Sequence, residues 1–176
     1  MFRNRRARAL ALALTVPVIA LALAACGGNG NDTASTSTAH PTTAGGKTAT
    51  IGLTSEGSLG KILVDSQDHT LYLFQKDTGT KSTCTGACAE QWPPLRASGK
   101  PVVGAGLSAS KVGTTPRSDG AAEVTYNGHP LYLFAGDQKP GDTNGQGITA
   151  FGGGWFALSA AGNQVTGTGT GSANGY

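Results

Sequence analysis

The sequence predicts a mainly β protein: a single compact domain of two hairpin-based pseudo-repeats with short helical turns, preceded by a signal peptide and a flexible linker. Three observations support this prediction. All 28 glycines of the 176 residues follow residue 26, well above the usual glycine content of about 7%, as is typical of a chain rich in turns. A nine-residue segment recurs 60 residues further along the chain. An Asn-Gly pair joins two strand-like runs, which is a strong hairpin signal.

The first 25 residues predict a lipoprotein signal peptide. A basic start is followed by an apolar stretch from Ala9 to Ala25, which is the pattern of a secretory signal. The segment Leu-Ala-Ala-Cys-Gly that ends at Gly27 resembles a bacterial lipobox. The resemblance implies lipid on Cys26, with acyl chains such as palmitate that anchor the protein to a bilayer. The alternative is a plain secretory signal with an incidental cysteine, and export holds under both interpretations.

The charge balance argues against nucleic acid as a partner. The formal charge of the whole chain is +3, but four of its 13 basic residues lie within the first eight positions. Removal of the signal leaves nine basic residues against ten acidic ones. Nucleic-acid-binding domains carry a strong excess of positive charge, which this nearly neutral chain lacks. The localisation we expect is the extracytoplasmic face of the cell membrane, with the lipid bilayer as partner through Cys26.

Composition divides the rest of the chain into linker, body and tail. Residues 26–47 contain the lipidated cysteine and then Gly, Asn, Thr, Ser and Ala, which bury too little apolar surface to fold. Residues 166–176 have the same character and are expected to be a flexible tail. The folded domain is therefore predicted over residues 48–165.

An internal duplication organises this domain. The segment His69–Asp77 matches His129–Asp137 at six of nine positions, in the pattern His-x-Leu-Tyr-Leu-Phe-x-x-Asp. A second pair of anchors follows in the same order, because Trp92–Leu95 aligns with Trp155–Leu158. We place repeat one at about residues 60–100 and repeat two at about residues 121–160.

Each repeat is predicted to contain a hairpin. In repeat two, Glu123–Tyr126 and His129–Phe134 flank the Asn-Gly pair. In repeat one, Lys61–Asp65 and Thr70–Phe74 flank a slightly longer turn of Ser, Gln and Asp.

Strand alternation predicts that both faces of the repeated strand are covered. Leu71 and Leu73 would point to one face, and Tyr72 and Phe74 to the other. Since both faces are apolar, we expect the other repeat to cover one and the loops that carry the tryptophans to cover the other. Helix is expected only as short turns near residues 85–91 and 108–112.

The repeated motifs resemble those of a known family. They follow the pattern Tyr-x-aromatic-x-x-Asp, which is similar to that of a family of predicted bacterial lipoproteins also called the secreted repeat of unknown function. The segments Cys84–Leu95 and Lys139–Gly147 resemble the corresponding parts of the family's two repeats, so that the likeness covers about residues 60–160. It implies a tethered extracytoplasmic protein of unknown activity and transfers no catalytic residue. The motif residues are Tyr72, Phe74 and Asp77 in repeat one, and Tyr132, Phe134 and Asp137 in repeat two.

The cysteines and histidines leave two interpretations open. With Cys26 lipidated, Cys84 and Cys88 remain as one pair in an oxidising compartment, which favours a disulfide that fixes the turn before Trp92. Alternatively the two thiols bind metal or act in redox chemistry. With His69 and His129 they would make a Cys₂His₂ set suited to zinc or copper. Against a metal, the identical placement of the two histidines suggests a contact within each turn.

The motif side chains also have two interpretations. Asp77 and Asp137 could share a cation or act as acid and base, or accept backbone N–H groups where each strand ends, which we favour. The repeated aromatic residues could form a ligand platform but are more typical of a core.

No enzyme is expected, because no nucleophile elbow, phosphate loop or zinc-protease motif is present. The predicted function is a binding or envelope-structural module without a cofactor, with an envelope protein or a small ligand as partner. The alternative is a copper, zinc or thiol-redox carrier using Cys84 and Cys88.

Overall fold

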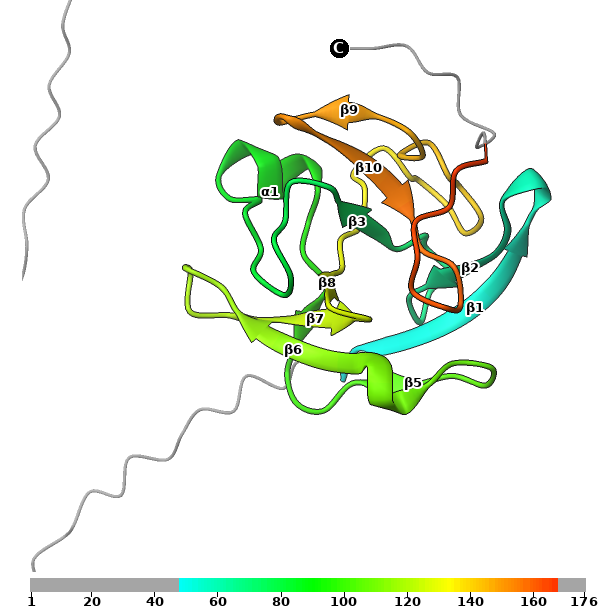
Figure 1. Ribbon diagram of the computed structural model, residues 1–176, viewed down its shortest axis with the longest axis horizontal. Helices are drawn as coiled ribbons and strands as arrows, with labels where there is room; N and C mark the ends of the chain where they lie inside the picture. The colour runs from blue at the N-terminus through cyan, green and yellow to red at the C-terminus, as the bar shows by residue number, and fades with distance from the viewer. Residues whose placement is uncertain (1–47, 168–176) are drawn as a thin grey trace, which may run out of the picture. The chain divides into compact units, whose positions relative to one another are not determined.

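Short strands joined by glycine-rich turns make up most of the regular structure over residues 48–167, which are the residues that the computed structural model describes (Figure 1). The predicted signal peptide, Cys26 and the linker lie outside the described residues, as does the tail beyond residue 167. Within residues 48–167 no helix has the length and apolar character needed to cross a membrane. The strands are β1 Thr50–Glu56, β2 Gly60–Val64, β3 Tyr72–Phe74, β4 Arg96–Ala97, β5 Val102–Val103, β6 Val112–Pro116, β7 Ala122–Tyr126, β8 His129–Pro130, β9 Thr149–Ala150 and β10 Gly153–Ala157.

The strands form three small sheets. Their orders are β2-β1-β5, β3-β10-β9 and β4-β7-β6, and β8 pairs with β7 beside the last of these. All the paired strands are antiparallel except β1 and β5, which align Ile51 with Val103 in parallel. The mainly β prediction is confirmed, and the arrangement into three sheets is a finding of the structure. Strand β1 was not expected from the sequence, which placed the start of repeat one at about residue 60.

The hairpin turn of repeat two is confirmed, but its second strand, β8, spans only His129–Pro130 and does not extend to Phe134 as predicted. Strands β7 and β8 pair Tyr126 with His129 across a two-residue turn. Asn127 and Gly128 both have positive φ, at 50° and 84°, as a type I′ turn requires. Asparagine and glycine tolerate this backbone better than other residues do, and so the pair determines where the chain reverses.

The hairpin of repeat one is shorter than expected. Val64 and Thr70 form a single antiparallel bridge, and the Leu71 amide donates to the Leu63 carbonyl at 3.0 Å. Beyond that point β3 leaves β2 and pairs instead with β10, which aligns Phe74 with Trp155 of repeat two. The strand of one repeat is therefore completed by a strand of the other.

The two motif strands meet at equivalent residues. The Tyr72 amide donates to the Tyr132 carbonyl at 2.8 Å, and the Tyr132 amide donates to the Tyr72 carbonyl at 3.0 Å. An antiparallel bridge between equivalent residues relates the two motifs by a local two-fold axis. The duplication seen in the sequence is thus a structural near-symmetry of the folded domain.

The predicted alternation of faces is confirmed. Leu71 and Leu73 pack in one hydrophobic cluster with Leu131, and Tyr72 and Phe74 pack in a second. We call these the leucine cluster and the aromatic cluster. The members of the leucine cluster are Ala49, Ile51, Leu63, Leu71, Leu73, Val124, Tyr126, Leu131 and Leu158. The members of the aromatic cluster are Leu59, Ile62, Tyr72, Phe74, Cys84, Cys88, Trp92, Tyr132, Trp155 and Ala157.

Over the described residues 48–167, helical structure is limited to three short segments. Helix α1 spans Ala87–Gln91, inside the segment where a helical turn was expected. One 3₁₀ turn spans Ala109–Lys111, as expected, and another spans Gly57–Leu59 between β1 and β2. Trp92 follows α1 directly, so the helix ends where the proline pair after Trp92 prevents its continuation.

Candidate functional site

The tyrosine of each motif is bonded to the aspartate of the other motif. The Tyr72 hydroxyl donates to Asp137 Oδ2 at 2.7 Å, and the Tyr132 hydroxyl donates to Asp77 Oδ2 at 2.7 Å. Both tyrosines are fully buried. In each motif the aspartate follows a turn instead of continuing the strand, because the Asp77 amide donates to the Phe74 carbonyl at 3.1 Å and the Asp137 amide donates to the Phe134 carbonyl at 3.0 Å. The motif therefore joins the two repeats through a pair of reciprocal tyrosine–aspartate hydrogen bonds.

The second oxygen of each aspartate accepts a backbone amide, as the favoured interpretation predicts. Asp77 Oδ1 accepts the Thr83 amide at 2.7 Å and the Thr83 hydroxyl at 2.8 Å. Asp137 Oδ1 accepts the Asn144 amide at 2.9 Å. Burial raises the pKa of Asp137 to about 6, although the bonds from Tyr72 and Asn144 act in the opposite direction. Each carboxylate thus fixes the loop that follows its own strand.

Four aromatic rings form a column whose two halves are related by the local two-fold axis, which crosses the column between the two tryptophans. Trp92 and Trp155 stack at its centre, with ring centroids 4.0 Å apart and planes 6° apart. Phe74 stacks on the outer face of Trp155 at 4.1 Å, and Phe134 lies against Trp92 at 4.3 Å. Each phenylalanine therefore contacts the tryptophan of the other repeat. Both tryptophans are fully buried, so these rings form core and offer no exposed ligand platform.

The tyrosines and one glycine close this column. Tyr72 meets Trp92 edge-on with centroids 5.5 Å apart, and Tyr132 meets Trp155 edge-on at 5.2 Å. Gly145 is required beside them, since a Cβ there would lie 2.8 Å from the Tyr72 ring and 2.9 Å from Trp92. Its amide donates to the Tyr72 hydroxyl oxygen at 3.3 Å.

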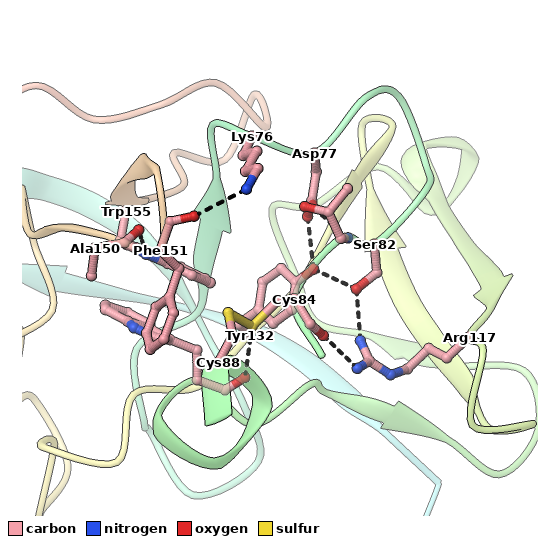
Figure 2. The surroundings of a disulfide bond; sticks show 12 residues. Lys76, Asp77, Ser82, Cys84, Cys88, Arg117, Tyr132, Ala150, Phe151 and Trp155 are labelled. Atoms are coloured by element: carbon pink, nitrogen blue, oxygen red, sulfur yellow. Dashed lines mark hydrogen bonds between the residues drawn. A yellow bond between two sulfur atoms is a disulfide. The ribbon is translucent and has the colours of Figure 1, made fainter. Parts of the chain in front are cut away.

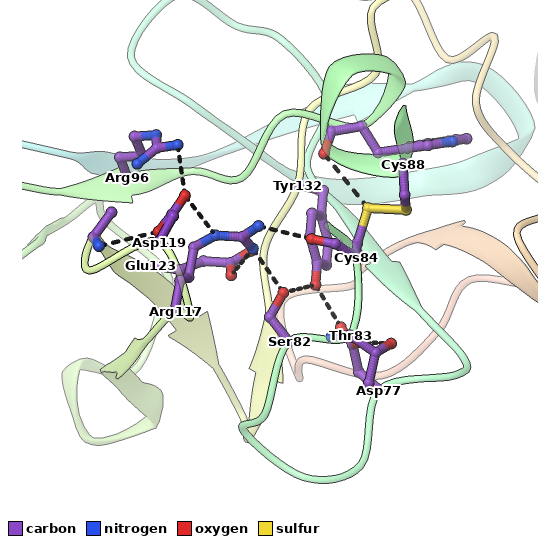
Figure 3. Close-up of polar contacts among 12 residues, drawn as sticks. Asp77, Ser82, Thr83, Cys84, Cys88, Arg96, Arg117, Asp119, Glu123 and Tyr132 are labelled. Carbon is purple, nitrogen blue, oxygen red and sulfur yellow. Dashed lines mark hydrogen bonds and ion pairs between the residues drawn. A yellow bond between two sulfur atoms is a disulfide. The ribbon is translucent and has the colours of Figure 1, made fainter. Parts of the chain in front are cut away.

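A chain of polar groups leads from Asp77 into the domain (Figure 3). Arg117 Nη1 donates to Ser82 Oγ at 2.7 Å, and Ser82 Oγ lies 2.7 Å from the Tyr132 hydroxyl. Because the Tyr132 proton is donated to Asp77, Ser82 must donate to Tyr132. The three hydrogen bonds that link Arg117, Ser82, Tyr132 and Asp77 therefore all run from donor to acceptor in the same direction, towards Asp77.

A buried ion pair ends this chain. Arg117 Nη1 donates to Glu123 Oε2 at 2.7 Å, and both side chains are almost entirely inaccessible to solvent. Burial raises the pKa of Glu123 to about 7, although Arg117 acts in the opposite direction. Burial by itself would lower the pKa of Arg117, but the hydrogen bond and charge of Glu123 raise it.

Sequence reasoning missed Arg117, Glu123 and Ser82. A signal for the ion pair is present, because Asp119-Gly120 is a turn pair between two strand-like runs. The resulting hairpin of β6 and β7 aligns Pro116 with Ala122 and brings Arg117 close to Glu123. No comparable signal exists for Ser82, which comes from the loop after Asp77.

Cys84 and Cys88 form the expected disulfide, with Cα atoms 5.2 Å apart (Figure 2). Arg117 Nη2 donates to the Cys84 carbonyl at 2.7 Å, and the Trp92 amide donates to the Cys88 carbonyl at 2.7 Å. The bridge therefore connects the polar chain to the central tryptophan of the column, which agrees with its expected role in presenting Trp92.

The histidines do not join the cysteines. His69 contacts its own turn, with Nδ1 3.4 Å from Asp65 Oδ2, as the turn-contact interpretation predicts. His129 lines a cavity of about 260 Å³ that Asp77 also lines. Among residues 48–167, no group of three or more histidine, cysteine, aspartate or glutamate side chains is placed to hold a metal ion. The proposed Cys₂His₂ set is therefore not assembled in this structure.

A larger cavity, of about 410 Å³, lies away from the motifs. It is lined by residues of β5, β6 and the segment between β4 and β5, and most of its lining is apolar. No sequence pattern pointed to it. Its residues come from separate strands, and only their assembly into two neighbouring sheets creates the space between them.

The comparisons with known proteins give one match. A family model described as a secreted repeat of unknown function matches residues 53–96 and 113–159. No curated protein and no solved structure matches the chain. The two matched segments correspond to the two structural repeats, and each contains one complete motif.

Proposed function

Because this chain belongs to the family of secreted repeats of unknown function, we propose that it is a lipid-anchored extracytoplasmic binding module. Its paired repeats would form a rigid scaffold held near the membrane by lipid on Cys26. An envelope protein or a small ligand would be the partner, and we expect neither catalysis nor a bound cofactor.

The cysteine inventory supports the anchor. The chain has three cysteines, and Cys84 and Cys88 are bonded to each other. No further cysteine of the chain is therefore left to form a disulfide with Cys26, which stands at the position where a lipobox places the lipidated residue. Labelling with radioactive palmitate tests this proposal: the intact chain should take up label and sediment with membranes, whereas Cys26→Ser should do neither. Label-free, soluble wild-type protein would refute the anchor.

The cavity of about 410 Å³ is the observation that carries the binding role. The motif tyrosines and aspartates are bonded to each other and the tryptophans are buried, so these side chains build the scaffold. A mostly apolar cavity of this size falls within the range of about 300–1,000 Å³ typical of ligand sites. It offers contact surface that the scaffold itself does not use.

Binding of a neutral apolar dye tests this role. Nile red should fluoresce on binding to residues 27–176, which retain the whole described body. Ala109→Trp should abolish the signal, because Ala109 lines the cavity and is exposed, so that the indole fills the space without entering the core. The matched control is Ala105→Trp, an exposed alanine outside the lining, which should leave binding unchanged. No wild-type signal, or equal loss in both variants, would refute the proposed site.

The alternative of a metal or thiol-redox carrier has less support. Both sulfurs are committed to a disulfide, so that binding copper or zinc through Cys84 and Cys88 would first require reduction. Intact mass and metal analysis of purified residues 27–176 distinguish the two. A mass two hydrogens below that of the fully reduced fragment, without bound metal, supports the scaffold role. The mass of the fully reduced fragment together with stoichiometric metal would support the carrier.

A further inference from the structure

The cavity of about 410 Å³ is lined by residues of two different sheets. Its lining includes Val103 of β5 with the preceding Pro101, and Val112 and Ala122 of the β6–β7 hairpin. Strand β5 pairs with β1, and β6 pairs with β7, so the two parts of the lining belong to different sheets. The space is therefore a product of how the sheets meet.

Part of the cavity lining also packs against the protein core. Ala97 and Val112 line the cavity and also pack against the leucine cluster. An apolar chain in this cavity would extend the contacts of the leucine cluster and would cover a surface that water now contacts.

The lining of the cavity carries positive charge and no negative charge. Lys100 is exposed and is the one ionisable side chain among the lining residues, which include no carboxylate. It takes part in none of the ion pairs formed within residues 48–167. The nearby Arg96 is bonded to Asp119 at 3.0 Å, so that its charge is already matched. The lining thus has an unmatched positive charge beside an apolar space.

We infer that this cavity binds a single-chain anionic amphiphile, a fatty-acid-like carboxylate taken up from solution. The hydrocarbon chain would lie over Ala97 and Val112, and the carboxylate would pair with Lys100. This inference rests on the proposed binding function and specifies the class of its ligand.

Calorimetric titration with decanoate tests the inference on residues 27–176. Decanoate should bind two- to fivefold more tightly than decanol, the range that corresponds to an exposed ion pair. Octanoate should bind more weakly by about fourfold for each missing methylene that the cavity buries. Lys100→Ala should remove the preference for decanoate over decanol. Lys81→Ala, which removes an exposed lysine outside the lining, should keep it.

A second set of variants tests the location. Ala109→Trp should eliminate decanoate binding and Ala105→Trp should retain it. Should Ala109→Trp fail to fold by circular dichroism, Thr114→Phe fills the same space from an exposed position on β6. Equal affinities for decanoate and decanol, or an unchanged preference in Lys100→Ala, would overturn the inference. If Nile red binds at the cavity and decanoate does not, the ligand class is wrong while the binding function stands.

Discussion

The Tyr72 hydroxyl reaches Asp137, 65 residues away in the other repeat, at 2.7 Å. The equivalent bond from Tyr132 to Asp77 runs in the opposite direction. Neither repeat satisfies its own motif, so each copy needs the other to satisfy its buried polar groups. This reciprocity gives a physical reason for the pairing of two motifs in one domain.

Removal of one of these hydroxyls should lower the free energy of unfolding. Tyr72→Phe leaves Asp137 Oδ2 buried without its donor, so we expect a loss of about 1–3 kcal/mol in the free energy of unfolding. A double-mutant cycle of Tyr72→Phe with Asp137→Ala, measured by urea unfolding, should show that the two losses are not additive. Tyr72→Phe with Tyr126→Phe provides the control, because Tyr126 bonds to the Ala160 carbonyl instead, and these losses should add. Additive losses in the first cycle would contradict the proposed coupling.

Breaking the buried ion pair should lower the free energy of unfolding further than removal of a tyrosine hydroxyl does. Arg117→Met leaves Glu123 buried without its counter-charge, and about 3–5 kcal/mol should be lost. Arg96→Met removes an exposed partner of Asp119 and should cost no more than about 1 kcal/mol. Urea denaturation of both variants gives the comparison. The double variant Arg117→Met with Glu123→Leu should recover much of the loss. Similar losses for Arg117→Met and Arg96→Met would contradict the burial of the Arg117–Glu123 pair.

Stability should fall as the pH rises from about 4 to 7. The folded-state pKa values of Asp137 and Glu123 are raised to about 6 and about 7, whereas the unfolded chain has ordinary values near 4. The folded state therefore holds protons that the unfolded state has released, and this contribution is present below pH 4 and disappears as the pH passes through 6 and 7. Unfolding free energies measured between pH 4 and 8 should show a smaller decline in Asp137→Asn. The exposed carboxylate of Asp68 supplies the control, as Asp68→Asn should leave the slope unchanged.

The disulfide should stabilise the domain only modestly. Its ring encloses three residues, so it restricts the unfolded chain less than a 15-residue loop, for which about 3 kcal/mol is expected. The double variant Cys84→Ala with Cys88→Ala should therefore remain folded, with a lower melting temperature. The structural change should be largest around Trp92 and should be detected as a change in tryptophan fluorescence. A variant that does not fold at all would show that the bridge contributes far more than its ring size implies.

The stacked indoles should have an optical signature. The ring centroids of Trp92 and Trp155 lie 4.0 Å apart with their planes 6° apart, which is close enough for their excited states to couple. The coupled bands have opposite signs when the two rings are rotated against each other within the stack. Circular dichroism of the native protein should contain a coupled pair of bands of opposite sign. Both Trp92→Phe and Trp155→Phe should remove it, and Phe74→Leu should keep it. If either tryptophan variant retained the bands, the stack would not be present in solution.

Much of the local structure was predictable from residue patterns. The Asn127-Gly128 turn, the short helix before Trp92 and the opposite faces of Leu71 and Tyr72 all follow from interactions between near neighbours in the chain. Strand β1 was missed although Ala49, Ile51 and Leu53 alternate with threonine and glycine and pack in or against the leucine cluster. Its strand conformation depends on pairing with β2 and β5, which residue patterns do not encode.

The sequence by itself determined that there are two copies of one unit, where each copy turns, and which side chains face inwards. Only the tertiary structure decided which partner each inward side chain meets. Tyr72 has identical surroundings in sequence whether it bonds to Asp77 or Asp137, and the antiparallel contact with Tyr132 makes the choice. The same holds for Arg117 with Ser82, and for the cavity between the sheets. Alternation along a strand fixes direction relative to the backbone, whereas the identity of a distant partner depends on how whole strands pack.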